Sequence, residues 1–152
     1  MRALIQEMVE QYDQPTIVDM EAGLEHLSRG TIRYVDCILI IIEPYFKSME
    51  TGAQLNRLAK ELEIKHVYCI ANKVRGTEDE RALETFCAER EMNLLGMIPN
   101  DDSLITADRA NLAPLDYDTN GIAVMAISEL SNKLINLDRK STRLNSSHVL
   151  IP

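Results

Sequence analysis

One run of six apolar residues, 37–42, constrains the fold of this chain more than any other feature. It reads Cys-Ile-Leu-Ile-Ile-Ile, and Glu43-Pro44 ends it. A strand that is apolar on both faces has to be covered on both faces, which is typical of a central strand in a parallel sheet. Three further strand-like runs, 16–20, 66–71 and 94–98, alternate with segments of helical periodicity. This order predicts an α/β fold, a parallel β-sheet with flanking helices joined by right-handed crossovers.

The helices are predicted from the spacing of apolar residues and from capping signals. Thr77-Glu78-Asp79-Glu80 has the pattern of a capping box at the start of one of them. The predicted helices are residues 3–12, a segment that begins near Ser48, 77–90, 102–111 and 122–137.

The composition is that of an ordinary globular domain, with 45% apolar and 26% charged residues. The formal net charge is −8, and three of the basic residues, Arg139, Lys140 and Arg143, lie in the last fourteen positions. A body this acidic repels nucleic acid, so a nucleic-acid partner is not expected. No apolar run approaches the ~20 residues that span a bilayer, and no basic-then-apolar leader opens the chain. We therefore expect no membrane association and a cytoplasmic location.

Residues 1–138 are expected to form one domain, because a chain of this length supports a single core. Residues 139–152 differ from the rest in being rich in Ser, Thr, Asn and Arg without helical spacing. They resemble translated sequencing-adaptor sequence. We expect a disordered tail of non-native origin that takes no part in the fold.

The three cysteines, Cys37, Cys69 and Cys87, show no close pairing in the sequence. Cys37 and Cys69 fall in strand-like runs, where a cysteine is most simply a small buried hydrophobe.

The first strand-like run ends at Asp19, and Gly23 follows four positions later. In an open α/β sheet, ligands bind at the carboxyl ends of the strands. A carboxylate there can hold a hydrated Mg²⁺ ion, and a glycine lets the backbone come close to a phosphate. The same short pattern also fits a strand end followed by an ordinary turn.

The longer stretch 19–31, Asp-Met-Glu-Ala-Gly-Leu-Glu-His-Leu-Ser-Arg-Gly-Thr, resembles the switch II segment of the MinD/ParA-like P-loop ATPases. Within them it is most similar to the CooC-type ATPases, accessory proteins for nickel insertion into carbon monoxide dehydrogenase. The resemblance continues through Ile42-Glu43-Pro44, Ile70-Ala71-Asn72-Lys73-Val74-Arg75 and Gly96-Met97-Ile98-Pro99. It covers roughly residues 15–100 closely and the rest of the chain loosely.

The resemblance implies catalytic roles for Asp19 and Gly23. Asp19 would be the Walker B-type carboxylate that holds Mg²⁺ through water, and the N–H of Gly23 would lie near the γ-phosphate.

It also implies a base-binding site at Asn72, Lys73, Pro99, Asn100 and Asp101. Asn72 would recognise adenine, because an amide offers a donor and an acceptor side by side. Lys73 would pack its aliphatic stem along the base. The other three residues would present backbone groups to the adenine and the ribose. For Asn72 and Lys73, the alternative is an ordinary turn after a strand.

The phosphate-binding loop of such ATPases has no counterpart in these 152 residues. Neither Gly-x-x-x-x-Gly-Lys-Ser/Thr nor the deviant Lys-Gly-Gly-x-Gly-Lys-Thr occurs, and no Cys-x-Cys is present. We therefore interpret the chain as the carboxy-terminal part of a P-loop ATPase domain, truncated at its amino terminus and inactive alone. ATP and Mg²⁺ would be cofactors of the intact protein. Nickel is possible, but its ligands are not in this chain.

The resemblance implies a homodimer in the intact protein, with carbon monoxide dehydrogenase or a related metalloenzyme as partner. Two alternatives remain open. One is a fragment of a MinD/ParA-like positioning ATPase, although 122–137 lacks the basic amphipathic face used for membrane attachment. The other is a non-enzymatic module that binds a partner.

The missing segment has a consequence for the sheet. In ATPases of this type the strand that bears the phosphate loop lies between the strands that correspond to 16–20 and 37–42. We therefore expect an open slot between these two strands, with few or no ladder hydrogen bonds joining them.

Overall fold

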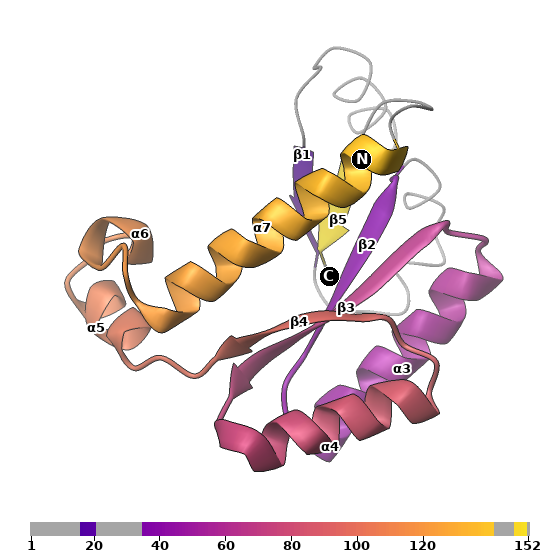
Figure 1. The fold of residues 1–152 in the computed structure, drawn as a ribbon, viewed down its shortest axis with the longest axis horizontal. Helices are drawn as coiled ribbons and strands as arrows, with labels where there is room; N and C mark the ends of the chain where they lie inside the picture. The colour runs from indigo at the N-terminus through magenta and orange to yellow at the C-terminus, as the bar shows by residue number, and fades with distance from the viewer. Residues whose placement is uncertain (1–15, 21–34, 142–147, 152) are drawn as a thin grey trace.

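The computed structural model describes residues 16–20, 35–141 and 148–151. It contains a five-stranded sheet in the order β1-β5-β2-β3-β4, and every neighbouring pair of strands is parallel (Figure 1). The strands are β1 (Thr16–Asp19), β2 (Cys37–Ile42), β3 (His66–Val74), β4 (Leu94–Pro99) and β5 (His148–Ile151). The helices are α3 (Phe46–Glu61), α4 (Gly76–Glu89), α5 (Ser103–Arg109), α6 (Pro114–Tyr117) and α7 (Ile122–Ser141). The predicted fold class is confirmed.

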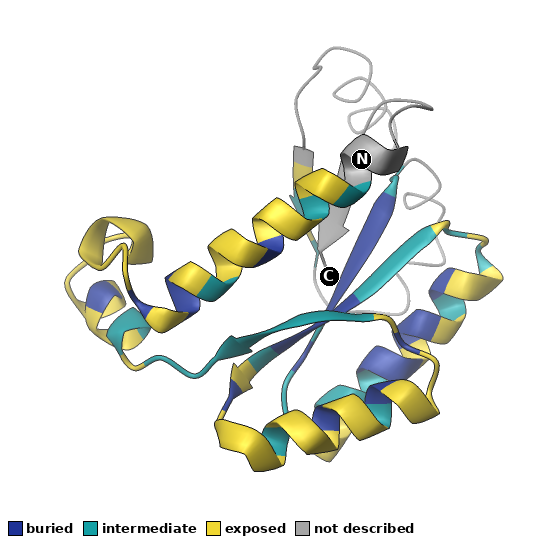
Figure 2. Ribbon diagram, in the orientation of Figure 1, coloured by how far each residue is buried: buried dark blue, intermediate teal, exposed yellow. Residues whose placement is uncertain are grey.

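The sheet is the middle of three layers, with α3 and α4 on one face and α7 on the other (Figure 1). Side chains of β2 alternate between the two faces, as the pleat requires. Ile38, Ile40 and Ile42 pack in the core on the side of α3 and α4, whereas Cys37 and Leu39 pack on the side of α7. Figure 2 shows β2 as the most completely buried strand. The expectation of a central strand covered on both faces is confirmed.

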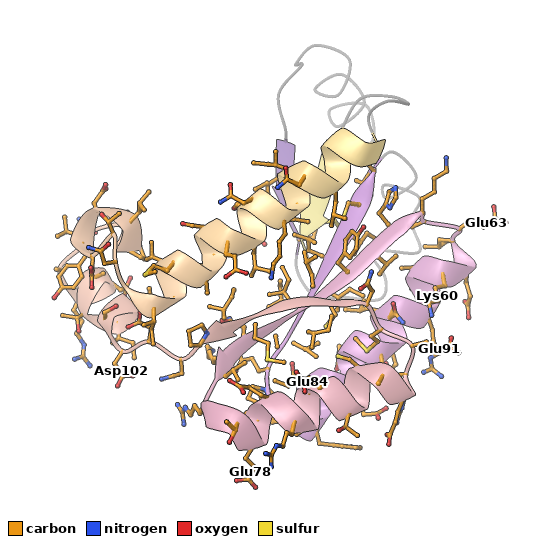
Figure 3. The ribbon with its side chains drawn as sticks, in the orientation of Figure 1. Lys60, Glu63, Glu78, Glu84, Glu91 and Asp102 are labelled. Atoms are coloured by element: carbon orange, nitrogen blue, oxygen red, sulfur yellow. The ribbon has the colours of Figure 1, made fainter. Side chains whose placement is uncertain are left out.

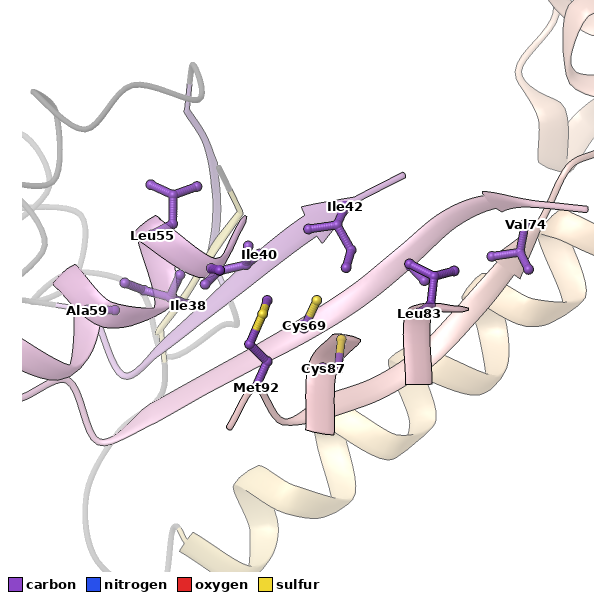
Figure 4. Packing of buried hydrophobic residues seen from close by; sticks show 12 residues of the cluster. Ile38, Ile40, Ile42, Leu55, Ala59, Cys69, Val74, Leu83, Cys87 and Met92 are labelled. Carbon is purple, nitrogen blue, oxygen red and sulfur yellow. The ribbon is translucent and has the colours of Figure 1, made fainter. Parts of the chain in front are cut away.

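The first core cluster lies between the sheet and the helices α3 and α4. Figure 4 shows Cys69 of β3, Cys87 of α4 and Met92 among the isoleucines of β2. Cys37, Cys69 and Cys87 are all free thiols and all buried. The interpretation of Cys37 and Cys69 as small buried hydrophobes is confirmed. Burial, aided by the carboxylate of Asp36, raises the pKa of the Cys37 thiol to about 12.

Helix α3 begins two residues before the predicted position near Ser48. Its N-cap is Tyr45, whose side chain makes no capping bond. The hydroxyl of Ser48 instead accepts the backbone N–H of Glu43 at 2.9 Å, which joins the end of β2 to the first turn of the helix. The buried side of α3 includes Gly52 and Asn56. The Asn56 side-chain Nδ2 has no hydrogen-bond partner within the described part of the chain.

Helix α4 also begins earlier than predicted, at Gly76. The expected capping box is shifted, because the carboxylate of Asp79 accepts the backbone N–H of Arg75 at 2.7 Å. At the other end of these helices, the Lys60 ammonium of α3 donates to the backbone oxygen of Glu91 at 3.0 Å and lies 3.5 Å from its carboxylate. Figure 3 shows Lys60 and Glu91 together at this end and Asp102 far from them, beside α5.

The expectation of a disordered tail at 139–152 is wrong for two segments that the structure describes. Residues 139–141 continue α7, which was predicted to end at 137. Residues 148–151 form β5, which pairs with β1 on one side and with β2 on the other. A short apolar run, Val-Leu-Ile, suits a central strand of a parallel sheet, which is the physical reason for this placement. The non-native origin of the tail stays a prediction.

The expected open slot is wrong as well. The predicted lack of pairing between β1 and β2 is confirmed. The space between them, however, is not open but holds β5. β5 pairs with β1 along Thr16–Asp19 and with β2 only at Cys37 and Ile38. The predicted helix 3–12 lies outside the described residues. Within the part that is described, no helix is long and apolar enough to cross a membrane.

Candidate functional site

The carboxyl ends of the strands meet along one edge of the sheet, because all five strands are parallel. Asp19 ends β1 and is exposed to solvent. Asn72 and Lys73 lie near the end of β3, and Pro99 ends β4. The topology therefore brings the predicted magnesium carboxylate and the predicted base-binding residues to the same edge. Gly23 lies outside the described residues, so its role stays a prediction.

Asn72 and Lys73 form a bulge in β3 rather than a turn after it. Ala71 is opposite Met97 and Val74 is opposite Pro99, so β3 carries one residue more than β4 over this stretch. Lys73 has a φ of 57°, in the left-handed region that non-glycine residues rarely occupy. Bulges beside functional sites commonly re-aim a side chain. The strand was predicted to end at Ala71, but it continues through this bulge to Val74.

Two hydrogen bonds hold this bulge. The backbone N–H of Lys73 donates to the side-chain oxygen Oδ1 of Asn72 at 3.0 Å. The Lys73 ammonium Nζ donates to Oε1 of Glu43 at 2.8 Å, an ion pair that joins the ends of β3 and β2. Sequence reasoning gave Glu43 no role. The only signal was its position directly after the most apolar strand, where a charged side chain reaches the edge of the sheet at which Asp19 and Asn72 lie, called the ligand edge below.

Asn100 connects the ends of β3 and β4. Its backbone N–H donates to the carbonyl oxygen of Val74 at 2.9 Å. Its side-chain oxygen accepts a long bond of 3.5 Å from Nη2 of Arg75, and its side-chain nitrogen donates to Asp102 at 3.3 Å. The side chain of Asn100 is thereby occupied by protein groups. A backbone role toward adenine or ribose for Pro99 and Asn100 stays a prediction.

Asp101 is held by two helices. Its oxygen Oδ1 accepts the backbone N–H of Ser103 at 2.9 Å, and Oδ2 accepts the backbone N–H of Ala123 in the first turn of α7 at 3.1 Å. Hydrogen bonds from the Ser103 hydroxyl, and then from the backbone N–H groups of Ala123, Ser103 and Ile122, hold the pKa of Asp101 below its usual value. Its carboxylate therefore has a structural role, at the N-terminus of α7.

Asp101→Asn should lower the melting temperature at pH 7, because an amide NH₂ would face a backbone donor. The pKa of Asp101 is lower in the folded state than the ordinary 3.8, so its carboxylate stabilises the fold above pH 3.8. That stabilisation is lost as the pH falls through the folded pKa. Melting curves from pH 7 to pH 2 should show the difference between the two proteins shrinking at the acid end.

Asp108→Asn, at an exposed carboxylate of α5, is the control for this experiment and should melt like the parent at each pH. A difference for Asp101→Asn that does not change with pH would contradict the role of the charge.

The part of the chain that the structure describes contains no metal centre built from several side chains. No group of three or more His, Cys, Asp or Glu residues there is arranged to hold a metal ion. Asp19 alone fits a hydrated Mg²⁺, which needs only one or two carboxylates when water and phosphate oxygens complete its coordination.

Comparisons with known proteins show which proteins this chain resembles. The chain is 39% identical over 117 residues to the carbon monoxide dehydrogenase accessory protein CooC of Rhodospirillum rubrum, covering 76% of this chain and 43% of CooC. It is 35% identical over 137 residues to an uncharacterized ATP-binding protein of Methanocaldococcus jannaschii, covering 90% of this chain and 52% of that protein. The chain thus spans about half the length of the curated relatives it matches. No family model matches it.

Solved structures show the same fold at lower identity. A ParA family ATPase from Chlorobium tepidum superposes with a TM-score of 0.68 at 23% identity, over 84% of this chain and 53% of that one. The MinD cell division protein of Aquifex aeolicus gives 0.60 at 18% identity, over 72% and 49%. The chain is therefore homologous to CooC and to ATP-binding proteins of M. jannaschii, and its fold is that of the MinD and ParA ATPases.

Proposed function

We propose that this chain supplies the switch II carboxylate and the base-binding edge of a CooC-like P-loop ATPase, which couples ATP hydrolysis to metal insertion into carbon monoxide dehydrogenase. The observation that carries the proposal is the similarity to CooC over 117 residues, together with the meeting of Asp19, Asn72 and Pro99 at one sheet edge. The fold of MinD and ParA supports the ATPase class. CooC is named as an accessory protein of carbon monoxide dehydrogenase. Metal insertion, with nickel as the cargo, is what the resemblance to the CooC-type ATPases implies.

In this proposal each described residue has one task. Bound Mg²⁺ supplies charge neutralisation at the phosphates. Asp19 would hold that ion through water, as an exposed carboxylate at the end of β1 can. Asn72 and Lys73 would receive the base, and the backbone of 99–101 would receive the ribose. The intact protein would act as a homodimer, which is what the resemblance to the CooC-type ATPases implies.

A non-enzymatic partner-binding module is the second candidate. The sequence contains no Walker A motif, which this chain would need in order to hydrolyse ATP by itself. Such a module would use the same sheet edge for a protein partner and would gain nothing from Asp19 as a metal ligand.

A chimera separates the two functions. The part of CooC that lies outside the matched region would be joined to residues 1–138 of this chain, so that its phosphate-loop strand can take the place that β5 has between β1 and β2. We expect no ATP hydrolysis by the chain alone and clear hydrolysis by the chimera. Asp19→Ala in the chimera should lower kcat about a hundredfold, because the charge stabilisation by a bound metal is worth several kcal/mol. Phosphate release measures both rates.

Asp116→Ala, at an exposed carboxylate of α6, is the matched control and should hydrolyse ATP like the chimera. A folded chimera that does not hydrolyse ATP would favour the partner-binding module, and hydrolysis that does not respond to Asp19→Ala would contradict the metal-binding role of Asp19. Phosphate release by the chain alone that disappears in Asp19→Ala would overturn the expected inactivity.

A further inference from the structure

The bulge at Lys73 is the one place in the described strands where the backbone is strained. In the whole described part of the chain, four non-glycine residues have a positive φ. Three of them, Glu63, Glu91 and Asn111, directly follow the C-caps of α3, α4 and α5, where a left-handed residue commonly ends a helix. Lys73 instead lies inside β3, at the ligand edge. A strained residue persists only where its surroundings hold it, and such residues gather at functional sites.

The surroundings that hold Lys73 come from β2. Its ammonium bonds to Glu43 at 2.8 Å, and the side chain of Glu43 is only 29% exposed. Glu43 is itself tied to α3, because its backbone N–H donates to the hydroxyl of Ser48. The contacts thus run from the first turn of α3 through the end of β2 to the bulge of β3.

The bulge decides which atoms of Asn72 are left for a ligand. Oδ1 accepts the N–H of Lys73 at 3.0 Å, which also establishes that this atom is the oxygen and not the nitrogen. None of the described hydrogen bonds involves the Asn72 Nδ2 amide. The side chain therefore offers mainly its NH₂ donor, whereas the sequence suggested a donor and an acceptor side by side. The ring nitrogens of a purine are acceptors and match that donor.

We propose that Glu43 is a positioning residue for base recognition: through Lys73 it holds the β3 bulge, so that Asn72 donates its amide to a ring nitrogen of the purine. This inference rests on the proposed nucleotide-binding function and deepens it. Glu43 does not touch the base in this scheme. Its effect reaches the ligand only through the bulge.

A second ion pair provides a matched control. Glu50 and Arg90 pair at 2.7 Å between α3 and α4, with side chains 26% and 42% exposed. The pair of Glu43 and Lys73 has nearly the same length and exposure. Glu50→Gln and Glu43→Gln should therefore change the stability of the fold by similar amounts, while only the second lies at the ligand edge.

The experiment titrates the full chain with adenosine and follows the Asn72 side-chain NH₂ by NMR. Exposed ion pairs of this kind shift an equilibrium by about twofold to fivefold, so Glu43→Gln should weaken adenosine binding by that factor. Glu50→Gln should bind like the parent. 1-Deazaadenosine, 3-deazaadenosine and 7-deazaadenosine each replace one of the three ring acceptors by C–H. The analogue that lacks the contacted nitrogen should bind more weakly and should not respond to Glu43→Gln.

Equal adenosine affinity in Glu43→Gln and Glu50→Gln would overturn the inference and leave the base site standing. Full affinity for all three deaza analogues would overturn the donor role of Asn72. If adenosine shifts no resonance at this edge, the inference also fails. The chimera then still decides the proposed ATPase function, because its readout is phosphate release.

Discussion

Gly52→Ala should destabilise the fold by about 2–3 kcal/mol, in the upper part of the range of about 1–3 kcal/mol that is typical of overpacked cores. A glycine-to-alanine change inside a helix ordinarily stabilises it by about 0.5–1 kcal/mol, so the sign of the effect is diagnostic. A Cβ at Gly52 would overlap Cγ2 of Ile42, a methyl group on a buried, β-branched side chain that cannot move aside. For a chain of this length, the melting temperature should fall by about 5–10 °C. Thermal unfolding followed by circular dichroism measures it.

The proposed cause can be checked with two further variants. Ile42→Leu removes the methyl group from Cβ, so it should restore part of the stability of Gly52→Ala, and a double-mutant cycle gives the coupling. Gly96→Ala is the comparison, because a Cβ there would meet the flexible end of Leu130 at 2.6 Å. Gly96→Ala should therefore lower the free energy of unfolding by less than Gly52→Ala does. A melting temperature for Gly52→Ala at or above that of the parent would show that α3 and β2 are not in close contact.

Removing residues 142–152 should have the second large effect. In the described sheet, β5 is the only strand paired with β1, and it covers one edge of β2. The deletion breaks a ladder of four residue pairs on one side and two on the other. Because each hydrogen bond contributes about 0.5–1.5 kcal/mol net, the free energy of unfolding should fall by several kcal/mol. The newly exposed edges should also promote aggregation.

Urea unfolding and amide hydrogen exchange measure this result. The amides of Thr16–Asp19 should lose their protection in the deletion variant. Leu150→Pro should have a similar effect, because proline removes a ladder donor, whereas Leu150→Val should be tolerated in a strand. Unchanged stability and unchanged exchange after the deletion would support the interpretation of residues 139–152 as a tail outside the fold.

The strongest sequence signals predicted their elements well, because these signals lie within the element itself and do not depend on distant contacts. The six apolar residues of β2 were predicted with the bounds that the structure shows, because a strand covered on both faces needs no contact information to be recognised. Helix starts were less accurate. α3 begins at Phe46 without a side-chain cap, and α4 uses Asp79 rather than Glu80 at its first turn. Capping patterns indicate a helix start only to within a residue or two.

The sequence predicted that the residues of the candidate site share one edge of the sheet, but it did not predict the hydrogen bonds and ion pairs that hold them. Asp19, Asn72 and Pro99 reach one edge because the order of strands and helices already predicts parallel pairing. The bond from Asp101 to Ala123 joins residues far apart in the chain, and no spacing rule indicates it. The same holds for the ion pair between Glu43 and Lys73.

The sequence by itself determined the α/β class, the central position of residues 37–42 and the edge at which a ligand would bind, because periodicity and strand order are properties of the chain alone. Only the tertiary structure decided how that edge is held and which strand lies between β1 and β2. The left-handed Lys73 is paired with Glu43, which lies thirty residues earlier in the chain, and a short apolar segment such as β5 becomes a strand only where two neighbouring edges offer it partners. Both depend on contacts between residues far apart in the sequence, which local patterns do not encode.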